Sequence, residues 1–476
     1  MKNYDPYKRI VLFFSSIINI ALLTSTFCVA WFSYYSKQMF NNITFYYKGN
    51  LVFIALYALL LVFFSRMYGG LKIGQLRRLE VVLSQALSVF FVNIVTYIVI
   101  CLLAFAVVNP VPLLLMTLTE YAIIVFWTII VMKIYNQLFQ PWKMLLIYGD
   151  RPAADLIYKV DARRDKYAIH DVICVDEGID AIAEKVKDFQ AVIIGDIPAQ
   201  KRNEVLKFCY QEGIRAYIMP KISDIILMGA DRIHVFDTPL LLSKGYALSV
   251  DQRIWKRIMD CVIALIILII TSPIMLISAL IIKCYDGGPV FYSQTRCTRG
   301  GKEFSIYKFR SMVVDAESDG VAKLAAQNDD RITPFGKFIR AVRIDELPQL
   351  INILKGDMSF VGPRPERPEI IEEYIKEMPE FVFRTRVKAG LTGFAQVYGK
   401  YNTTPYDKLK LDLFYIENYS LWMDIKLIIM TVKTLLKKEA TEGIEAGQTT
   451  AQKESREESS ASLEQIVADV VKERTE

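Results

Sequence analysis

The sequence predicts a membrane α-helical bundle of four spans, an α/β doubly wound domain, and a mixed α/β monotopic domain that carries a re-entrant membrane helix hairpin. Three observations predict this organisation. Uncharged apolar runs of membrane length fill the first third of the chain and return at 261–282. Between residues 143 and 220, short apolar runs alternate with helical stretches. A polar block rich in basic and aromatic residues then extends to about residue 436.

The composition excludes several classes of protein. Of the 476 residues, 53% are hydrophobic, whereas soluble domains have about 45–50%. The excess lies in the long runs, so a wholly soluble, collagen-like, coiled-coil or disordered chain is excluded. The 57 Lys and Arg against 51 Asp and Glu give a net charge of +6. This balance is too mild for a nucleic-acid-binding surface, and no nucleic-acid partner is expected.

Cysteines and histidines limit the chemistry further. The seven cysteines form no C-x-x-C pair, so we interpret them as reduced and buried, and not as disulfides or a zinc site. The histidines are His170 and His234, too few to favour a histidine-based zinc site or a Ser-His-Asp triad. An acid, base or nucleophile should therefore be a carboxylate, a lysine or a tyrosine.

Residues 1–140 should form four membrane-spanning helices. The apolar segments are 10–32, 51–65, 81–108 and 113–132. The N-terminal arm holds three basic residues and the loop 66–78 holds four, whereas the alternate loops hold two and none. Because cytoplasmic loops carry the excess of Lys and Arg, this count places the N-terminus and everything after Met132 in the cytoplasm. The first span lacks a small-residue cleavage site and is expected to be retained.

Glu120 lies inside the fourth of these segments. A carboxyl is costly there and marks a functional site in many membrane proteins. We favour the simpler interpretation, in which Glu120 faces the other helices of the bundle.

Residues 141–250 have the pattern of a Rossmann-like cytoplasmic module followed by a linker. The predicted strands are 144–148, 172–175, 191–194 and 214–219, and the predicted helices are 152–160, 179–187 and 202–211. A dinucleotide site needs a G-x-G-x-x-G first turn. The turn here, residues 149–154, has one glycine and an acidic residue. We therefore expect no bound NAD and favour a regulatory or assembly module.

Residues 251–436 open with an apolar helix, 254–283, which has two interpretations at the membrane. Its uncharged run is long enough for a full span. However, basic residues flank it on both sides, and Ser272-Pro273 interrupts its middle. A helix broken there has arms of about 22 and 14 Å, too short for a hydrocarbon core of about 30 Å. We therefore favour a re-entrant hairpin with both ends in the cytoplasm.

The tail, residues 437–476, should be mostly disordered, because it is rich in Glu, Ser, Gln and Thr and lacks aromatic residues. One stretch has helical spacing and could dock as a short amphipathic helix. Its apolar residues are Leu463, Ile466, Val467, Val470 and Val471.

The residues suited to phosphate chemistry are concentrated between 285 and 400. The basic ones are Arg296, Arg299, Lys302, Lys308, Arg310, Arg340 and Arg343. Arginine is suited to bidentate phosphate contacts, so the cluster could hold lipid headgroups or a nucleotide diphosphate. A membrane-surface patch without catalytic function is the simpler interpretation of the basic residues alone.

Asp345 and Glu346 are adjacent carboxylates in this basic setting. A carboxylate can accept a phosphoryl group as an acyl phosphate, or it can ligate Mg2+ beside a diphosphate. Alternatively, the two residues cap a helix that begins at Leu347-Pro348. Their spacing alone does not decide between these interpretations.

The block resembles the bacterial sugar transferases called polyprenol-phosphate phosphoglycosyl transferases, in particular their large monotopic members. Seven motifs carry the resemblance in order across 254–436: PVFY at 289–292, YKFRSM at 307–312, DELPQ at 345–349, GDMS at 356–359, GPRP at 362–365, LTGFAQV at 391–397 and YSLW at 419–422. The four spans and the degenerate nucleotide fold are also similar to the long members. Two departures, Lys388-Ala389-Gly390 for the usual Arg-Pro-Gly and Tyr398 for a common Asn, bear on sugar choice more than on reaction type.

The resemblance implies a two-step reaction. Asp345 would attack the β-phosphorus of a UDP-sugar and release UMP, and undecaprenyl phosphate would then take the sugar phosphate from Asp345. Glu346 would help to hold Mg2+ or assist proton movement, with Asp345 as the other metal ligand. Arg340 and Arg364 would bind phosphate and the nucleotide side. Lys308 and Arg310 are the further phosphate ligands that we expect.

The same resemblance implies a location at the cytoplasmic face of the bacterial inner membrane and a function in the first step of exopolysaccharide or capsule repeat-unit synthesis. Beside the lipid bilayer, it suggests downstream polysaccharide glycosyltransferases and a second copy of the chain as partners. Glucose and galactose are the favoured sugars. Two alternatives stay open: a membrane glycosyltransferase that moves only the sugar and releases UDP, and a non-enzymatic membrane scaffold or sensor.

Overall fold

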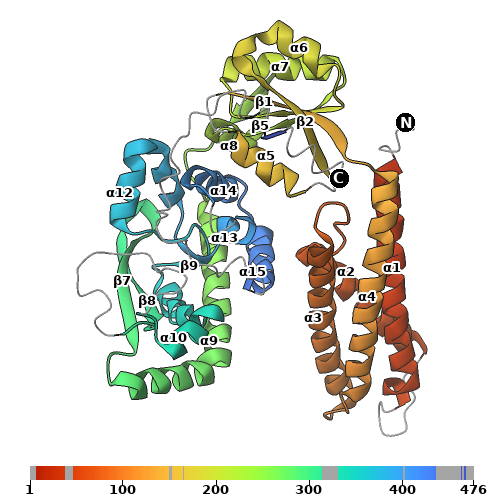
Figure 1. The fold of residues 1–476 in the computed structure, drawn as a ribbon. Coiled ribbons are helices and arrows are strands. Elements are labelled where there is room, and N and C mark those ends of the chain that lie inside the picture. Colours follow the sequence, from red (N-terminus) through yellow and green to blue (C-terminus); the bar gives the residue numbers. More distant parts are fainter. Residues whose placement is uncertain are drawn as a thin grey trace. The chain divides into compact units, whose positions relative to one another are not determined.

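The computed structural model describes residues 7–37, 47–149, 153–163, 166–313, 331–399 and 403–435, with positions 463, 466 and 467. The chain forms two compact units (Figure 1). Met1–Met219 and Ser455–Glu476 belong to the first unit, and Pro220–Glu454 is the second. Most of the tail, for which disorder is predicted, lies outside the described residues.

The first unit begins with four long apolar helices. They are α1 (Lys8–Ser33), α2 (Tyr47–Tyr68), α3 (Arg78–Ala104) and α4 (Val111–Leu138), and a 3-10 turn, Tyr35–Lys37, follows α1. Each helix overlaps one of the predicted spans and is long and apolar enough to cross a membrane. Aromatic side chains pack between them, and the rings of Phe27 and Tyr57 stack with their centroids 4.2 Å apart.

Glu120 of α4 lies inside this bundle, as the simpler interpretation predicted. Its side chain is fully buried. It accepts hydrogen bonds from the Tyr57 hydroxyl at 2.6 Å and from Nδ2 of Asn93 at 2.8 Å. Hydrogen bonds between helices compensate part of the cost of burying a carboxyl among apolar side chains. Glu120 therefore links α2, α3 and α4.

A four-stranded parallel sheet follows the bundle. The strands are β1 (Trp142–Tyr148), β2 (Tyr167–Cys174), β3 (Ala191–Ile194) and β4 (Arg215–Ile218), in the order β2-β1-β3-β4. The helices are α5 (Ala154–Asp161), α6 (Ile179–Val186) and α7 (Ala199–Gln211), with a 3-10 turn, Val175–Glu177, after β2. Each strand overlaps a predicted one. All four residues of β3 are buried, as expected where both faces of a parallel sheet are covered.

Apolar side chains pack beside Gly149 at the carboxyl end of β1, the edge of the sheet where a dinucleotide lies in a nucleotide-binding fold. A Cβ added to Gly149 would lie 3.1 Å from Ile197 and 3.2 Å from Val175, and both side chains are buried. Residues 150–152 of the predicted turn lie outside the described residues.

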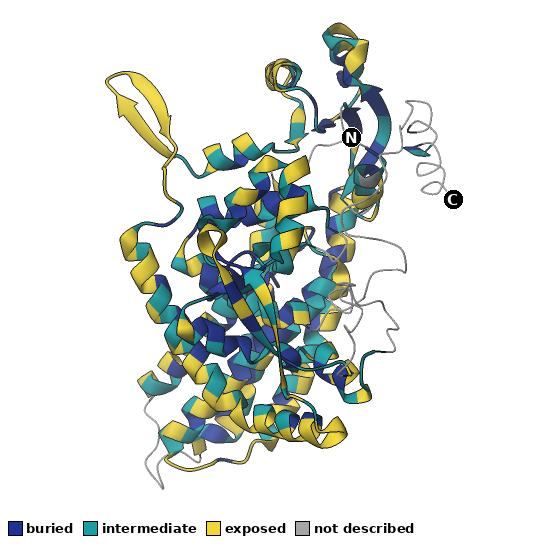
Figure 2. Cartoon of the chain, turned by 90° about the vertical axis from the view of Figure 1, so that its left-hand side faces the viewer, coloured by how far each residue is buried: buried dark blue, intermediate teal, exposed yellow. Residues whose placement is uncertain are grey.

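The second unit is a mixed α/β unit built on short strands. It opens with α8 (Ile222–Met228) and an exposed hairpin of β5 (Asp231–Val235) and β6 (Thr238–Leu242), shown in yellow in Figure 2. A second antiparallel hairpin joins β7 (Phe291–Cys297) to β8 (Glu303–Phe309), with a 3-10 turn at Arg299–Gly301. The short strands β9 (Ser359–Val361) and β10 (Gly390–Thr392) pair in parallel.

Helices and 3-10 turns complete this unit. They are α9 (Val250–Asp286), α10 (Pro334–Ala341), η5 (Ile344–Glu346), α11 (Gln349–Lys355), α12 (Pro368–Glu377), η6 (Pro379–Arg386), α13 (Phe394–Tyr398), α14 (Pro405–Glu417) and α15 (Leu421–Leu435). Apart from α10 and η5, these elements share one core with β8 and β9, which includes Leu350, Phe360 and Leu413. Ile339 of α10 and Ile344 of η5 instead pack in a smaller cluster with Ile282 and Phe309. Asp345 therefore lies on the chain between the smaller cluster and the main core.

The helix α9 continues without a break through the predicted position. It is one helix of 37 residues with Pro273 inside it, and Figure 1 shows it turning along its length. Proline lacks the N–H that would bond to the carbonyl four residues earlier, which is that of Ile269. The Ser272 hydroxyl donates to this carbonyl at 2.8 Å. The predicted break is therefore wrong, because Ser272 satisfies the freed carbonyl and the backbone stays helical through the proline.

The first half of α9 is anchored in the second unit by buried polar contacts. Nζ of Lys256 lies 2.6 Å from the Asp424 carboxylate, and Asp260 accepts hydrogen bonds from Oγ of Ser359 and the backbone N–H of Phe360. Nη2 of Arg257 donates to the carbonyl of Leu354 at 2.7 Å. The apolar helix is thus fixed to α11, the helix that follows Asp345 and Glu346.

Candidate active site

Asp345 and Glu346 lie in η5, a tight turn between α10 and α11. Thr333 caps α10 by accepting a hydrogen bond from the N–H of Gly336. Arg343 then adopts a left-handed conformation, with φ of 59°, which reverses the chain. Helix α11 has Pro348 at its N-cap and no side-chain hydrogen bond at that position. The capping interpretation of the two carboxylates therefore has no support among the described contacts.

Glu346 is surrounded by cations. Its Oε1 accepts hydrogen bonds from Nζ of Lys308 at 3.0 Å and from Nη2 of Arg364 at 3.1 Å, and Nη1 of Arg343 lies 3.7 Å away. Burial alone would raise the pKa of Glu346, but the positive charges of Lys308, Arg364 and Arg343 outweigh burial and lower it. Glu346 is therefore an ionised group whose charge is compensated within the site.

Asp345 has a different environment from its neighbour. Its side chain is buried, and its Oδ1 has no hydrogen-bond partner among the described residues. Burial raises the pKa of Asp345 and the negative charge of Glu346 raises it further, while Lys308, Arg343 and Arg340 lower it. The basic residues individually favour the ionised form, but burial determines the net direction of the pKa shift. Asp345 is a desolvated carboxyl with one oxygen available to a ligand.

The other predicted phosphate ligands do not all lie together. Lys308 and Arg364 contact Glu346, and the charge of Arg340 acts on Asp345. Nη1 of Arg340 is buried without a hydrogen-bond partner among the described residues. Arg310 instead pairs with Asp286 at the end of α9. This ion pair connects the hairpin β7–β8 to α9. No described contact joins Arg310 to Glu346.

The loop that presents Arg364 is held by its backbone. The N–H of Gly390 donates to the carbonyl of Pro363 at 2.9 Å, and the N–H of Cys297 donates to that of Glu366 at 3.0 Å. Prolines at 363 and 365 limit the backbone on either side of Arg364. A side chain at Gly362 would collide with the Lys388 carbonyl, so glycine permits the close approach of these segments. The result is a rigid platform for Arg364.

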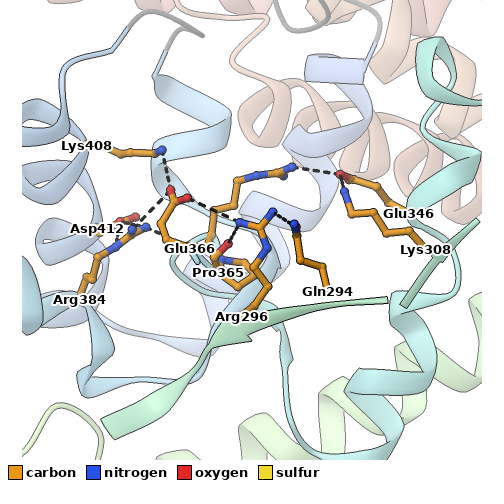
Figure 3. Close-up of polar contacts among 10 residues, drawn as sticks. Gln294, Arg296, Lys308, Glu346, Pro365, Glu366, Arg384, Lys408 and Asp412 are labelled. Atoms are coloured by element: carbon orange, nitrogen blue, oxygen red, sulfur yellow. Dashed lines mark hydrogen bonds and ion pairs between the residues drawn. The ribbon is translucent and has the colours of Figure 1, made fainter. Parts of the chain in front are cut away.

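A second charged cluster lies behind this loop (Figure 3). Arg384 donates through Nη2 to the carbonyl of Arg364 at 3.0 Å and is paired with Asp412 at 2.8 Å. Glu366 is paired with Lys408 at 2.9 Å, and its Oε1 lies 3.6 Å from Nη1 of Arg384. Arg296 donates to the carbonyl of Pro365 at 3.3 Å. The cluster therefore holds two consecutive carbonyls of the loop, those of Arg364 and Pro365.

Sequence reasoning missed the role of this second cluster. Glu366 directly follows the GPRP motif, so the sequence contains a local signal for it: an acidic residue near Arg364 can form an ion pair with a basic residue. Arg384 and Asp412 are 28 positions apart and belong to different helical segments. No local pattern connects them, so only the fold brings them together.

Two small hollows open beside these residues, and Arg364 lines both. One, of about 260 Å3, is lined by Arg296, Ile306, Lys308, Gln349, Arg364, Pro365 and Gly390. The other, of about 230 Å3, extends past Cys297, Thr298 and Glu366 to Arg384. Basic side chains on the walls suit an anionic group. The larger hollow reaches Lys308, which contacts Glu346.

The two carboxylates fit Mg2+ only as part of a site that substrate phosphates complete. No group of three or more Asp, Glu, His or Cys residues gathers in the part of the chain that the structure describes. Mg2+ is commonly bound by one or two carboxylates together with phosphate oxygens and water. The buried, unpartnered oxygen of Asp345 is the feature that would accept such an ion.

Comparisons with known proteins agree with the motifs of this segment. Residues 251–438 match the family model described as Bacterial sugar transferase. A UDP-N-acetylgalactosamine-undecaprenyl-phosphate N-acetylgalactosaminephosphotransferase of Aeromonas hydrophila is 44% identical over 184 residues, 38% of this chain and 43% of that protein. A UDP-glucose:undecaprenyl-phosphate glucose-1-phosphate transferase of Escherichia coli K12 is 41% identical over 209 residues, 43% of each chain.

A shorter relative is matched over most of its length. The UDP-glucose:undecaprenyl-phosphate glucose-1-phosphate transferase of Caulobacter vibrioides is 41% identical over 193 residues, which is 40% of this chain and 71% of that protein. The chain thus spans less than half of the Aeromonas and Escherichia relatives and about two thirds of the Caulobacter one. The family match, residues 251–438, includes Asp345, Glu346 and Arg364.

Proposed function

The chain belongs to the bacterial sugar transferase family, and on this basis we propose that it transfers a sugar 1-phosphate from a UDP-sugar to undecaprenyl phosphate. The functions named for its relatives support the two substrates. The observation that supports the chemistry most is the pair of unlike carboxyls: Asp345 is buried with an unpartnered oxygen, and Glu346 is neutralised by basic residues.

In the first step, an oxygen of the Asp345 carboxylate attacks the β-phosphorus of the UDP-sugar. A new P–O bond forms to Asp345, and the bond between the β-phosphorus and the bridging oxygen breaks, so that UMP leaves with that oxygen. Lys308 and Arg364 line the larger hollow and would reduce the repulsion between the diphosphate and the carboxylates.

In the second step, an oxygen of undecaprenyl phosphate attacks the phosphorus of the aspartyl phosphosugar. The bond to Asp345 breaks, the carboxylate is regenerated, and the sugar is left on an undecaprenyl diphosphate. Mg2+ held by Asp345, Glu346 and the substrate phosphates would supply further charge neutralisation when it is bound. In this proposal Arg340, whose buried Nη1 lacks a partner among the described residues, would bind a phosphate in either step.

The membrane placement that fits this reaction is a re-entrant α9 with both ends in the cytoplasm. The exposed apolar side chains of α9, such as Ile269 and Ile270, suit lipid, and the bend lets the helix enter and return. Arg257 and Asp260 tie the same helix to the segment around Asp345. Bending at Pro273 would therefore keep the carboxylates at the headgroup level of the inner membrane, where the lipid phosphate lies.

A single incubation tests this function against its alternatives. Purified protein is mixed with undecaprenyl phosphate and a panel of UDP-sugars that includes the glucose, galactose and N-acetylgalactosamine derivatives. UMP release with one of them, lost in Asp345→Asn, is the expected result. Release of UDP would favour a glycosyltransferase that moves only the sugar. No turnover with any UDP-sugar would favour a scaffold or sensor over an enzyme that starts polysaccharide repeat units for downstream glycosyltransferases.

A further inference from the structure

The two faces of the parallel sheet β2-β1-β3-β4 are covered unequally by the helices that connect its strands. On one face, Leu145, Ile147 and Val192 pack against α6 and α7. On the other face, Met144, Leu146 and Val172 pack against α5. That helix has 8 residues, about 12 Å at 1.5 Å per residue. A parallel sheet needs both faces covered, so the second face requires another element.

The C-terminal segment supplies the missing cover. Leu463 and Val467 are 1% and 4% exposed and belong to the same apolar cluster as Met144, Leu146 and Val172. Ile466 is partly buried against this cluster. The three positions are helical, and their spacing puts them on one side of a helix. The prediction that this stretch docks is confirmed for these three residues, whereas Val470 and Val471 lie outside the described residues.

We propose that this sheet face is a binding site for a short amphipathic helix and that its occupant is the chain's own segment at 463–467. In the sequence, Ser462 and Gln465 have the spacing of a capping box, the pattern with which helices begin. Isolated helices of this length are marginal in water, so the segment is ordered by the sheet and not by itself. The module is therefore assembled from two parts of the chain, with the transferase segment, 251–438, between them.

This arrangement gives the nucleotide-fold module a function that does not involve a nucleotide. At the carboxyl end of β1, Ile197 and Val175 pack beside Gly149. The second face of the sheet receives Leu463 and Val467. The partner that fits this face has large apolar side chains at positions i and i+4 of a helix. The C-terminal segment is thus an integral part of the module.

Hydrogen–deuterium exchange on the full-length protein in detergent tests the proposal. The double variant Leu463→Asp with Val467→Asp places two charges on the apolar face. Exchange in β1 and β2 should become at least about tenfold faster, because local opening becomes easier when a buried apolar contact is lost. The matched control is Tyr210→Asp on α7, where the wild-type side chain is 88% exposed. It should leave exchange in β1 and β2 unchanged.

Adding a peptide of residues 455–476 distinguishes the loss of a bound helix from a general destabilisation of the module. Added to the double variant, the wild-type peptide should restore protection of β1 and β2, whereas a peptide with both Asp substitutions should not. Exchange in β7, β8 and α11 serves as an internal control for misfolding and should stay at the wild-type rate. Wild-type exchange of β1 and β2 in the double variant would overturn the proposal.

Cross-linking identifies the source of the segment. Isotopically light and heavy full-length protein are mixed, cross-linked and digested. Links between the segment at 463–467 and α5 should join peptides of one isotopic label. If light–heavy links occur at the frequency expected for random pairing of chains, a second copy supplies the segment. That result would overturn the assignment of the segment to the chain's own tail.

Discussion

Arg364 donates a hydrogen bond to Glu346, which lies 18 positions earlier in the sequence, with Nη2 of the arginine 3.1 Å from Oε1 of the glutamate. This contact joins the carboxylate pair to a loop whose carbonyls are held by Arg384 and Arg296. A substitution that displaces this loop therefore also displaces Arg364. The proposed reaction therefore depends on side chains that do not touch the carboxylates.

Arg384→Gln should weaken UDP-sugar binding and destabilise the fold. It removes the donor to the Arg364 carbonyl and leaves Asp412, whose pKa burial already raises, without its cation. Breaking a buried pair costs about 3–5 kcal/mol. We expect KM for the UDP-sugar to rise by more than kcat falls, because Asp345 and Glu346 are unchanged. Steady-state kinetics and thermal unfolding measure the two effects.

Arg386→Gln is the matched control for that variant. Arg386 is paired with Glu417 at 3.4 Å, and its side chain is 32% exposed. A partly exposed pair contributes about 1 kcal/mol or less. Equal changes in KM for Arg384→Gln and Arg386→Gln would contradict the positioning role of Arg384.

Glu366→Gln should destabilise the protein at neutral pH and lose this effect in acid. Burial alone would raise the pKa of Glu366, but Lys408 and Arg384 lower it from 4.5 to about 2. Such a carboxyl stabilises the fold above its unfolded pKa and loses this contribution as the pH falls through its folded pKa. The shift corresponds to about 3 kcal/mol at neutral pH. Denaturant titrations should show wild type and variant converging between pH 4.5 and about 2, and a pH-independent difference would contradict this.

Asp345→Asn should abolish turnover and raise the melting temperature at neutral pH. Burial and the charge of Glu346 raise the pKa of Asp345. A raised carboxyl pKa means that the folded state binds the proton more tightly, so stability falls as the pH rises through that pKa. The amide removes this cost. A lower melting temperature for Asp345→Asn would show that the carboxylate stabilises the site.

Glu346→Gln should have the opposite effect on stability. Lys308 and Arg364 lose a common anionic partner, and we expect a loss of stability smaller than that of a fully buried pair, because both cations are partly exposed. We also expect a severe loss of UMP release. The melting temperatures of the two variants are compared at one pH. If Glu346→Gln were as stable as Asp345→Asn, the ion pairs of Glu346 would contribute nothing to the stability of the fold.

Cys284 is a natural probe for the topology of α9. It is exposed near the end of the helix, beyond the bend at Pro273. If α9 is re-entrant, a membrane-impermeant maleimide should leave Cys284 unlabelled in intact cells and label it in inside-out vesicles, as mass spectrometry of the Cys284 peptide can show. Labelling from outside the cell would mean that α9 crosses the membrane.

Local patterns predicted the regular elements of the first unit well and the charged contacts poorly. The apolar runs of the first third indicated α1 to α4, and the DELPQ motif indicated Asp345 and Glu346, because in both cases the signal lies in adjacent residues. The pairing of Arg310 with Asp286 and of Arg384 with Asp412 depends on how distant segments pack. The continuity of α9 depended on one hydroxyl, that of Ser272, bonding to Ile269.

The most direct test of the proposed mechanism is the mass of the protein after incubation with a UDP-sugar and no lipid acceptor. We expect an adduct of one phosphosugar that maps to the peptide containing Asp345, in step with UMP release, and that disappears when undecaprenyl phosphate is added. Asp345→Asn should show neither the adduct nor UMP. A protein that releases UMP only when the lipid is present, and never carries the phosphosugar, would contradict Asp345 as the nucleophile.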